Sequence, residues 1–416
     1  MSGRTRCLFA ALLLTACAGS RAVAEEVVRI ELVVAAPEFD CADVPLHASL
    51  ELPAPLAAWP ADQIAVKLTE KGPNASAVPG QIVRKGDRTE LWWIAPRLQI
   101  GRSSVWTATL RSRPEVTGER FAWKEAPREH LDVLWAGRPV LRYMYAHDES
   151  TPERLHQTYK PYHHVFDAAG RSPITKGPGG LYTHHRGVFI GWNKLACDGR
   201  EYDFWHMKDG VSQQHERFLY KTAGLVLARS EALIHWIDER GEPVVIERRE
   251  VTLFCQPPPT IALLEFRIAL TAAKADIVLD GDPEHAGVQY RAHNAVAEGG
   301  NEVTATYRFH ADGIDPHKDE DLPWAAMSYR LNGRRYSVQH MNHPDNPTPT
   351  VYSAYRDYGR FGAFFKKKVA VGETLPLRYR IGVIAAELPD RAALAARYAA
   401  FASSPPANVV SMKTEK

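Results

Sequence analysis

The chain has 416 residues, of which 51 are Lys or Arg and 49 are Asp or Glu, so its formal net charge is +2 at pH 7. Neither sign is gathered into a long block, which excludes the electrostatic footprint of a protein that binds nucleic acid. Beyond the N-terminus no apolar run approaches the roughly 20 residues that a transmembrane helix needs.

The N-terminus predicts an export signal over residues 1–24. Basic residues precede the apolar stretch 8–16, which is too short to span a bilayer. Residues 14–17 resemble a bacterial lipoprotein cleavage box that would leave Cys17 lipidated, whereas ordinary signal cleavage would follow Ala24. We therefore expect an exported protein, either periplasmic or an outer-membrane lipoprotein anchored at Cys17.

Residues 27–130 predict a small β-sandwich. Short apolar runs such as 27–34, 91–94 and 105–110 alternate there with turns marked by proline and glycine. The charged segment 114–130 reads as a linker, and we place the domain boundary near residue 130.

Residues 131–387 predict a second, large antiparallel β-sandwich. Apolar and polar side chains alternate over 262–270, 303–310 and 377–383, as expected for strands with one buried face. Only residues 388–416 look helical, with Asp390 capping a short helix that precedes a tail. The predicted fold class is all-β.

Residues 183–192 contain the densest group of reactive side chains. Their β-branched and aromatic content predicts a strand, in which His184 and Arg186 face one side while His185 and Gly187 face the other. The two imidazoles would then act together only where a turn or bulge breaks the strand. His185 is the first candidate, because Gly187 would leave its side bare enough for a ligand.

Further histidines recur beside arginine and aromatic residues at 161–164, 203–206, 284–291 and 340–347. Aromatic rings stack on sugars, arginine binds carboxylates or hydroxyls, and histidine transfers protons near neutral pH. The sequence therefore predicts a carbohydrate-active enzyme with a glycan or sugar ligand. The predicted catalytic residues are His185, His285 and His343, and the predicted substrate-binding residues are His163, His184, Arg186, Trp192 and Arg291.

Two other functions compete with this prediction. One is a glycan-binding lipoprotein without turnover, and the other is a metal-dependent oxidase with histidine ligands. The helical two-histidine motif of many zinc enzymes is missing, so no residue is assigned to a metal and no cofactor is predicted. The alternating pair Glu265 and Arg267 is interpreted as a structural ion pair and not as an acid–base dyad.

These clusters, in this order, resemble a family of exported bacterial proteins labelled "methane oxygenase PmoA", otherwise a domain of unknown function. The matching stretches are 160–164, 183–192, 203–205, 284–291, 343–347, 358–362 and 377–380. The membrane methane monooxygenase subunit of the same name consists of transmembrane helices, which this sequence lacks. The resemblance implies a large β-sandwich akin to the mutarotase-like supersandwich, in bacteria that degrade polysaccharides.

Overall fold

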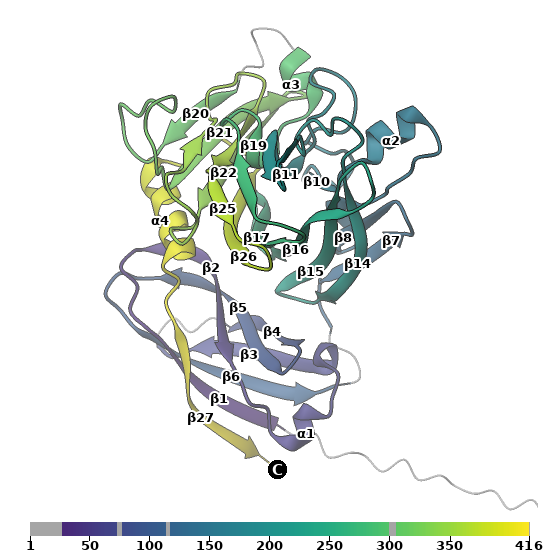
Figure 1. Cartoon of the computed structure of the whole chain (residues 1–416). Coiled ribbons are helices and arrows are strands. Elements are labelled where there is room, and N and C mark those ends of the chain that lie inside the picture. Colours follow the sequence, from purple (N-terminus) through teal and green to yellow (C-terminus); the bar gives the residue numbers. More distant parts are fainter. Residues whose placement is uncertain (1–26, 73–76, 114–116, 299–304, 416) are drawn as a thin grey trace, which may run out of the picture.

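The computed structural model describes residues 27–72, 77–113, 117–298 and 305–415. The prediction of an all-β fold is confirmed: antiparallel sheets make up most of the molecule and the helices are short (Figure 1). The export signal predicted over 1–24, including Cys17, lies outside these residues. Within the described ranges, no helix has the length and apolar character needed to cross a membrane.

The N-terminal region is one seven-stranded sheet with the order β2-β5-β4-β3-β6-β1-β27. Its end strands β2 and β27 approach each other, so the sheet coils around a core of its own. Alternate residues of β1 are buried, which is the two-residue period of a strand. The strands are β1 Val27–Val34, β2 Cys41–Ser49, β3 Ile64–Glu70, β4 Ala77–Lys85, β5 Arg88–Leu98, β6 Ser104–Ser112 and β27 Ala407–Glu415, with the short helices α1 Ala54–Ala57 and η1 Ala61–Gln63.

The C-terminal residues return to this N-terminal sheet. Helix α4, Arg391–Ala402, begins at Asp390, whose carboxylate accepts the Ala393 N–H at 2.7 Å as the predicted cap. The tail expected beyond this helix is the strand β27, which pairs antiparallel with β1 along its whole length. Most side chains of β27 are exposed, so the sequence carries no alternation that would predict a strand.

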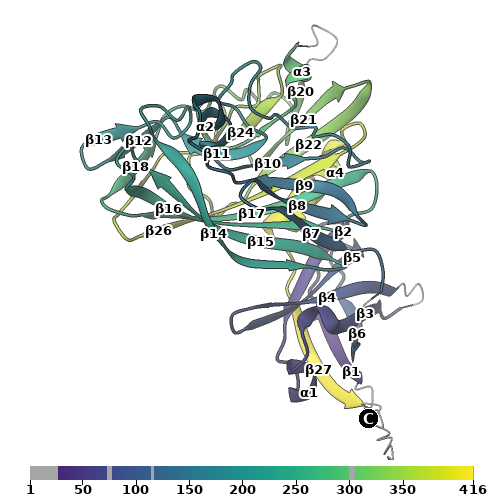
Figure 2. The same ribbon diagram turned by 90° about the vertical axis from the view of Figure 1, so that its right-hand side faces the viewer.

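The large region is a sandwich of two eight-stranded sheets with a four-stranded sheet beside them (Figure 2). We call the first the site sheet, in the order β23-β24-β19-β11-β10-β9-β8-β7, and the second the back sheet, in the order β14-β15-β16-β17-β26-β22-β21-β20. Their facing apolar side chains form one core, as the alternation over 262–270 predicts.

The strands of the site sheet are β7 Phe121–Ala126, β8 His130–Trp135, β9 Arg138–Met144, β10 Tyr162–Val165, β11 Val188–Trp192, β19 Ala286–Arg291, β23 Val351–Tyr352 and β24 Arg360–Phe364. Those of the back sheet are β14 Ser212–Ala223, β15 Leu227–Ile237, β16 Pro243–Phe254, β17 Thr260–Ala272, β20 Thr306–Phe309, β21 Trp324–Leu331, β22 Arg334–Asn342 and β26 Thr374–Ile384. The four-stranded sheet contains β12 Lys194–Cys197, β13 Arg200–Tyr202, β18 Ile277–Asp280 and β25 Lys367–Val369, and the remaining helices are α2 Pro152–Thr158 and α3 Asn294–Glu298.

Strand β7 belongs to the site sheet, although its residues precede the expected boundary near residue 130. It pairs with β8 over its full length, and Phe121 packs edge-on against Trp135 with ring centroids 4.7 Å apart. The segment between the two regions that reads as a linker therefore contains a strand of the large sandwich.

The two regions meet through a small buried contact. The side-chain oxygen of Gln81 in β4 accepts the backbone N–H groups of Val226 and Leu227, both at 2.9 Å. Next to it, Trp92 of β5 packs against Phe254 at the end of β16. The N-terminal sheet is thus fixed to the outer side of the back sheet by both apolar packing and hydrogen bonds.

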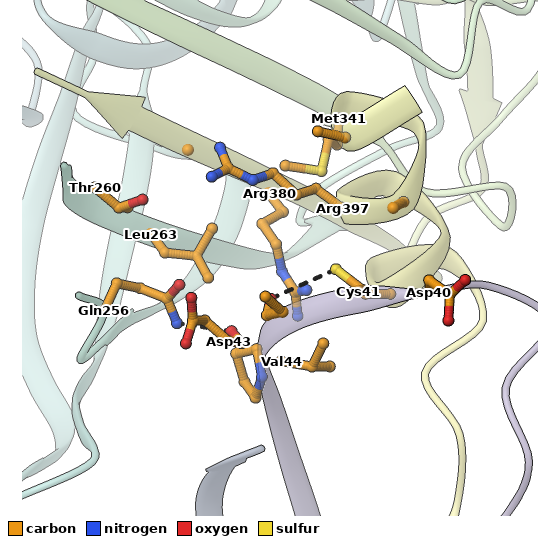
Figure 3. Close-up of a pocket in the computed structure, with 16 residues that line it drawn as sticks. Asp40, Cys41, Asp43, Val44, Gln256, Thr260, Leu263, Met341, Arg380 and Arg397 are labelled. Atoms are coloured by element: carbon orange, nitrogen blue, oxygen red, sulfur yellow. Dashed lines mark hydrogen bonds between the residues drawn. The ribbon is translucent and has the colours of Figure 1, made fainter. Parts of the chain in front are cut away.

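A cavity of about 230 Å³ lies beside this contact, where β2, β26 and α4 meet (Figure 3). Cys41 and Asp43 line it from β2, while Arg397 enters it from α4 and Arg380 from β26. None of the predicted site residues lines this cavity.

The Gln81 contact predicts a measurable loss of stability in Gln81→Leu. The leucine removes the acceptor for two buried N–H groups, which should lower the free energy of unfolding by roughly 2 kcal/mol in urea denaturation. Gln157→Leu is the control, because that side chain is exposed in α2 and its loss should change stability by less than about 0.5 kcal/mol. Equal stability of the two variants would contradict a tight junction between the regions.

Candidate functional site

The chain preceding β11 forms a turn and not the strand predicted over residues 183–187. Strand β11 begins only at Val188, the His185 N–H donates to the Tyr182 carbonyl at 2.9 Å, and Tyr182 has a φ of 56°. This turn is the break in the strand that His184 and His185 need in order to act together. The rings of His184 and His185 lie edge to face with centroids 4.5 Å apart.

Four imidazoles meet at this turn, on the outer side of the site sheet. The His184 ring lies 4.4 Å from that of His206, and the His206 ring lies 5.2 Å from that of His285. We call His184, His185, His206 and His285 the histidine cluster. Its members come from three loops that precede β11, follow β13 and precede β19, and strands β11 and β19 pair side by side.

Two members of the cluster are held by aspartates at the same spacing. His206 Nδ1 lies 2.8 Å from an Asp203 carboxylate oxygen, and His285 Nδ1 lies 2.8 Å from one of Asp282. A nitrogen that faces a carboxylate carries the proton, so Nε2 is the free nitrogen of each ring. Neither Nε2 has a hydrogen-bond partner among the described residues.

Each aspartate is itself fixed by the backbone. The Asp203 carboxylate accepts the N–H groups of Trp205 and His206, at 3.1 and 2.8 Å, and Asp282 accepts that of Glu284 at 2.9 Å. Burial raises the pKa of both carboxyls, but the hydrogen bonds from the imidazoles and amides outweigh it and hold each pKa below its usual range. The aspartates are therefore ionised at neutral pH and stabilise a positive charge on the rings.

His184 and His185 have a different environment. Burial, followed by the charge of Lys160, lowers the pKa of His184 to about 2. Burial and the charge of Arg360 also hold the pKa of His185 well below its usual value. Both rings are thus neutral near pH 7 and supply hydrogen-bonding nitrogens. His185 Nδ1 and His184 Nε2 are buried and have no partner among the residues that the structure describes.

Aromatic rings surround the cluster. Tyr182 is 42% exposed and packs on His185 and on Tyr358, with ring centroids 5.2 and 4.9 Å apart. Trp205 is fully buried and lies edge-on to His185 at 5.9 Å. Tyr182 therefore presents an aromatic ring to solvent beside the cluster, whereas Trp205 packs against the cluster from the interior.

Two glycines allow the backbone to pack closely here. A side chain at Gly191 would place its Cβ 2.3 Å from the Phe204 carbonyl oxygen, so the loop that carries His206 rests directly on β11. At Gly187 a Cβ would lie 2.2 Å from the His163 carbonyl oxygen. The interpretation of Gly187 as a bare surface for a ligand is therefore wrong, because the neighbouring strand β10 fills that space.

Two predicted binding residues point into the core and not toward the cluster. The His163 ring lies between Tyr143 and Phe266, at 4.8 and 5.4 Å. Trp192 is fully buried and its indole N–H donates to the Phe365 carbonyl at 3.3 Å. Alternation along β10 and β11 places both side chains on the face that packs against the back sheet.

His343, predicted as catalytic, lies after β22 of the back sheet. Its Nε2 is 3.0 Å from the Arg378 guanidinium and its ring packs on Phe401 of α4 at 5.2 Å. The structure therefore brings together His184, His185 and His285 of the predicted residues and leaves His343 on a different sheet.

The predicted anchors Arg186 and Arg291 are fully buried. Arg186 donates to the carbonyls of Thr183 and His185, at 2.6 and 2.9 Å, and so holds the turn in place. Arg291 donates to the Ala292 carbonyl at 3.0 Å, while its Nε and Nη2 have no partner within the described ranges. Arg186 is thus bound to the scaffold through both Nη groups and leaves only Nε without a partner among the described residues, whereas Arg291 leaves two donors without one.

The part of the chain that the structure describes contains no group of three or more His, Cys, Asp or Glu side chains placed to hold a metal ion. The four imidazoles contact one another through their rings instead of converging on one point.

The fold and the cluster define an all-β sandwich protein with a histidine-rich site on the outer side of one sheet. A family of unknown function (DUF6807) matches residues 130–399, which hold nearly all of the large sandwich and most of α4, and the chain belongs to this family. No match to the chain is found among curated proteins. Strands β1 to β7 and β27 lie outside the matched residues.

Proposed function

We propose that the large sandwich is an enzyme that binds a saccharide at the histidine cluster. One of His206 and His285 takes a proton from the saccharide and the other gives a proton to it. The observation that carries this proposal is the pair of imidazoles held through Nδ1 by ionised aspartates, with rings 5.2 Å apart. Their side chains are 23% and 34% exposed, so both rings are partly open to solvent.

A pair of this kind supplies one base and one acid to the same substrate. One neutral imidazole takes a proton from carbon or oxygen at Nε2, and the other, as imidazolium, returns a proton elsewhere on the substrate. After turnover the two rings have exchanged protonation states, and exchange with water restores them. Epimerases and eliminating lyases need this combination.

Glycoside hydrolysis through two carboxylates fits the site less well. Asp203 and Asp282 are bonded to the imidazoles, and Glu284 accepts a hydrogen bond from Tyr355 at 3.0 Å and pairs with Arg356. No carboxylate of the described residues near the cluster is left to act as a nucleophile. The geometry therefore favours proton abstraction over hydrolysis.

The saccharide itself is inferred from Tyr182 and from the setting. An exposed aromatic ring beside polar nitrogens is the usual arrangement for stacking on a sugar face. The resemblance of the sequence to exported bacterial proteins labelled "methane oxygenase PmoA" adds a periplasmic or lipid-anchored setting, in which polysaccharide fragments are available.

The test is turnover of a broad panel of oligosaccharides, with products identified by mass spectrometry. His206→Gln and His285→Gln keep a hydrogen-bonding side chain but cannot exchange a proton near neutral pH, so each should lower turnover by about 10²-fold or more. Binding and melting temperature should change little. His310→Gln is the control, because His310 is exposed and follows β20, an edge strand of the back sheet.

His185→Gln tests whether the base is His185 or one of the pair His206 and His285. It replaces a neutral ring by a neutral amide, so it should retain far more turnover than the His206 or His285 variants. A loss confined to His185→Gln would instead restore His185 as the acid or base. Binding of oligosaccharides without any turnover would support the glycan-binding alternative, and no binding at all would refute the proposal.

A further inference from the structure

Five cationic side chains are buried around the histidine cluster: Lys160, Lys176, Arg186, Arg291 and Arg360, each with at most 1% of its surface exposed. None of them forms an ion pair with a described carboxylate. A buried cation without a counter-charge is costly, and proteins normally pair such groups. The outer side of the site sheet thus carries an excess of positive charge next to a candidate active site.

The partners of these cations are neutral. Lys160 Nζ donates to the Trp205 carbonyl at 2.5 Å, and Arg360 donates to the side-chain oxygens of Gln289 and Ser353, both at 3.3 Å. Lys176 Nζ donates to the Gly179 carbonyl. These bonds orient the cations without any ion pair, and only the charges of Asp203 on Lys160 and of Glu298 on Lys176 oppose the effect of burial on these two lysines.

Arg291 is the least satisfied of the five. Its Nη1 donates to the carbonyls of Ala292 and Tyr358, but its Nε and Nη2 are buried and have no partner in the part of the chain that the structure describes. Nε and Nη2 form the side edge of the guanidinium, which binds a carboxylate through two parallel hydrogen bonds.

The same edge binds carboxylates elsewhere in this molecule. Arg142 uses Nε and Nη2 on Asp132 at 2.6 and 3.0 Å, and Arg249 uses them on Glu247 at 2.6 and 3.0 Å. At Arg291 the edge is present and the carboxylate is missing. Among the described residues no acidic side chain takes its place.

Electrostatics agrees with the geometry. Burial lowers the pKa of Arg291 to about 10, and the neighbouring Arg360 acts in the same direction. Burial, with the charges of Arg291 and Arg186, lowers the pKa of Lys176 to about 7. A bound anion would offset both effects.

A path of contacts links Arg291 to the surface. Its guanidinium lies over the Tyr358 ring at 4.8 Å, and Tyr358 packs against the exposed ring of Tyr182. Tyr182 follows Gly179 and Gly180, whose φ angles of 81° and 62° suit glycine. Two aromatic contacts thus connect the Arg291 guanidinium with an exposed ring.

We propose that the saccharide is a uronate, whose carboxylate is bound by the Nε and Nη2 edge of Arg291. This inference rests on the proposed function and names its substrate class. Pairing the carboxylate with arginine makes the adjacent C–H more acidic, because it stabilises the negative charge that develops when an imidazole removes that proton. The buried cations and the aspartate-held histidines then serve the same reaction.

The experiment compares uronate oligosaccharides with their methyl esters, which keep the backbone and remove only the charge. Oligomers of galacturonate, glucuronate and mannuronate are titrated into the full chain by calorimetry. At least one acid should bind 10-fold or more tightly than its ester. Arg291→Gln should abolish that difference, while Arg330→Gln, an exposed position in β21, should preserve it.

Arg291→Lys is the second variant, because it retains the buried charge but lacks the two-donor edge. Arg291→Lys should weaken binding of the acid and leave binding of the ester unchanged. This comparison tests the inference even if Arg291→Gln does not fold. Equal affinity for acids and esters would overturn the uronate inference and leave the saccharide proposal intact. Binding of acetate or sulfate with no affinity for any oligosaccharide would overturn both.

Discussion

Replacing Glu265 by glutamine should lower the free energy of unfolding by about 3–5 kcal/mol, the cost of leaving buried charges without their partner. Glu265 in β17 is 4% exposed and accepts hydrogen bonds from Arg380 at 2.6 Å, Arg267 at 2.9 Å and Arg378 at 3.4 Å. The substitution removes the only carboxylate with which these three guanidinium groups form ion pairs among the described residues. The sequence interpretation of Glu265 and Arg267 as a structural ion pair agrees with this network.

The loss of stability in Glu265→Gln should depend on pH in a defined direction. Burial raises the pKa of Glu265, but Arg380, Arg267 and Arg378 outweigh it and hold the pKa far below the usual range. A carboxyl with a depressed folded-state pKa stabilises the protein fully above its unfolded pKa of about 4.3. This contribution is lost as the pH falls toward the folded-state pKa.

Urea denaturation at pH 7, 4 and 3 measures both expectations. The gap between wild type and Glu265→Gln should be widest at pH 7 and should narrow below about pH 4. Arg267→Gln is the control, because that side chain is 46% exposed and its loss should cost no more than about 1 kcal/mol. A gap that is equally small for both variants, or independent of pH, would contradict the network.

Deleting residues 406–416 should destabilise the N-terminal sheet and make the protein associate. The deletion removes β27 and with it eight cross-strand pairs to β1, which together contribute on the order of 5 kcal/mol. It also exposes β1, whose alternating apolar residues and free backbone groups form an edge that other chains can pair with.

Light scattering after gel filtration and calorimetry test this deletion. The truncated chain should form oligomers and melt at a lower temperature than wild type. Val410→Thr is the control, because Val410 is 58% exposed in β27 and its replacement leaves the backbone pairing intact. A monomeric truncated chain with an unchanged melting temperature would show that β27 contributes little.

Strand periodicity predicted the sheets but not the turn at the site. The alternation over 262–270 corresponds to β17, since one face of a strand that packs in a sandwich must be apolar. Residues 183–187 have similar β-forming side chains, yet they follow Gly179 and Gly180 and bend at Tyr182. Local propensity cannot report this bend, because packing of the loop against neighbouring strands decides it.

The sequence also could not predict that the histidines converge, because their convergence depends on how β11 and β19 pair. One signal was present all the same: an aspartate precedes a histidine by three residues at both Asp203–His206 and Asp282–His285. This spacing lets a carboxylate bond both the backbone and the ring. It indicates His206, which lies in the stretch 203–206 but is not among the predicted site residues.

The pairing of β27 with β1 has a consequence for the order in which the molecule is completed. Strand β1 leads the described chain, while β27 follows every other strand, so β1 lacks its second neighbour throughout synthesis of the residues between them. The large sandwich contains all of its own strands before β27 is made and can form its core without it. The N-terminal sheet, whose other strands are synthesised first, therefore receives its final strand only after the large sandwich has been synthesised.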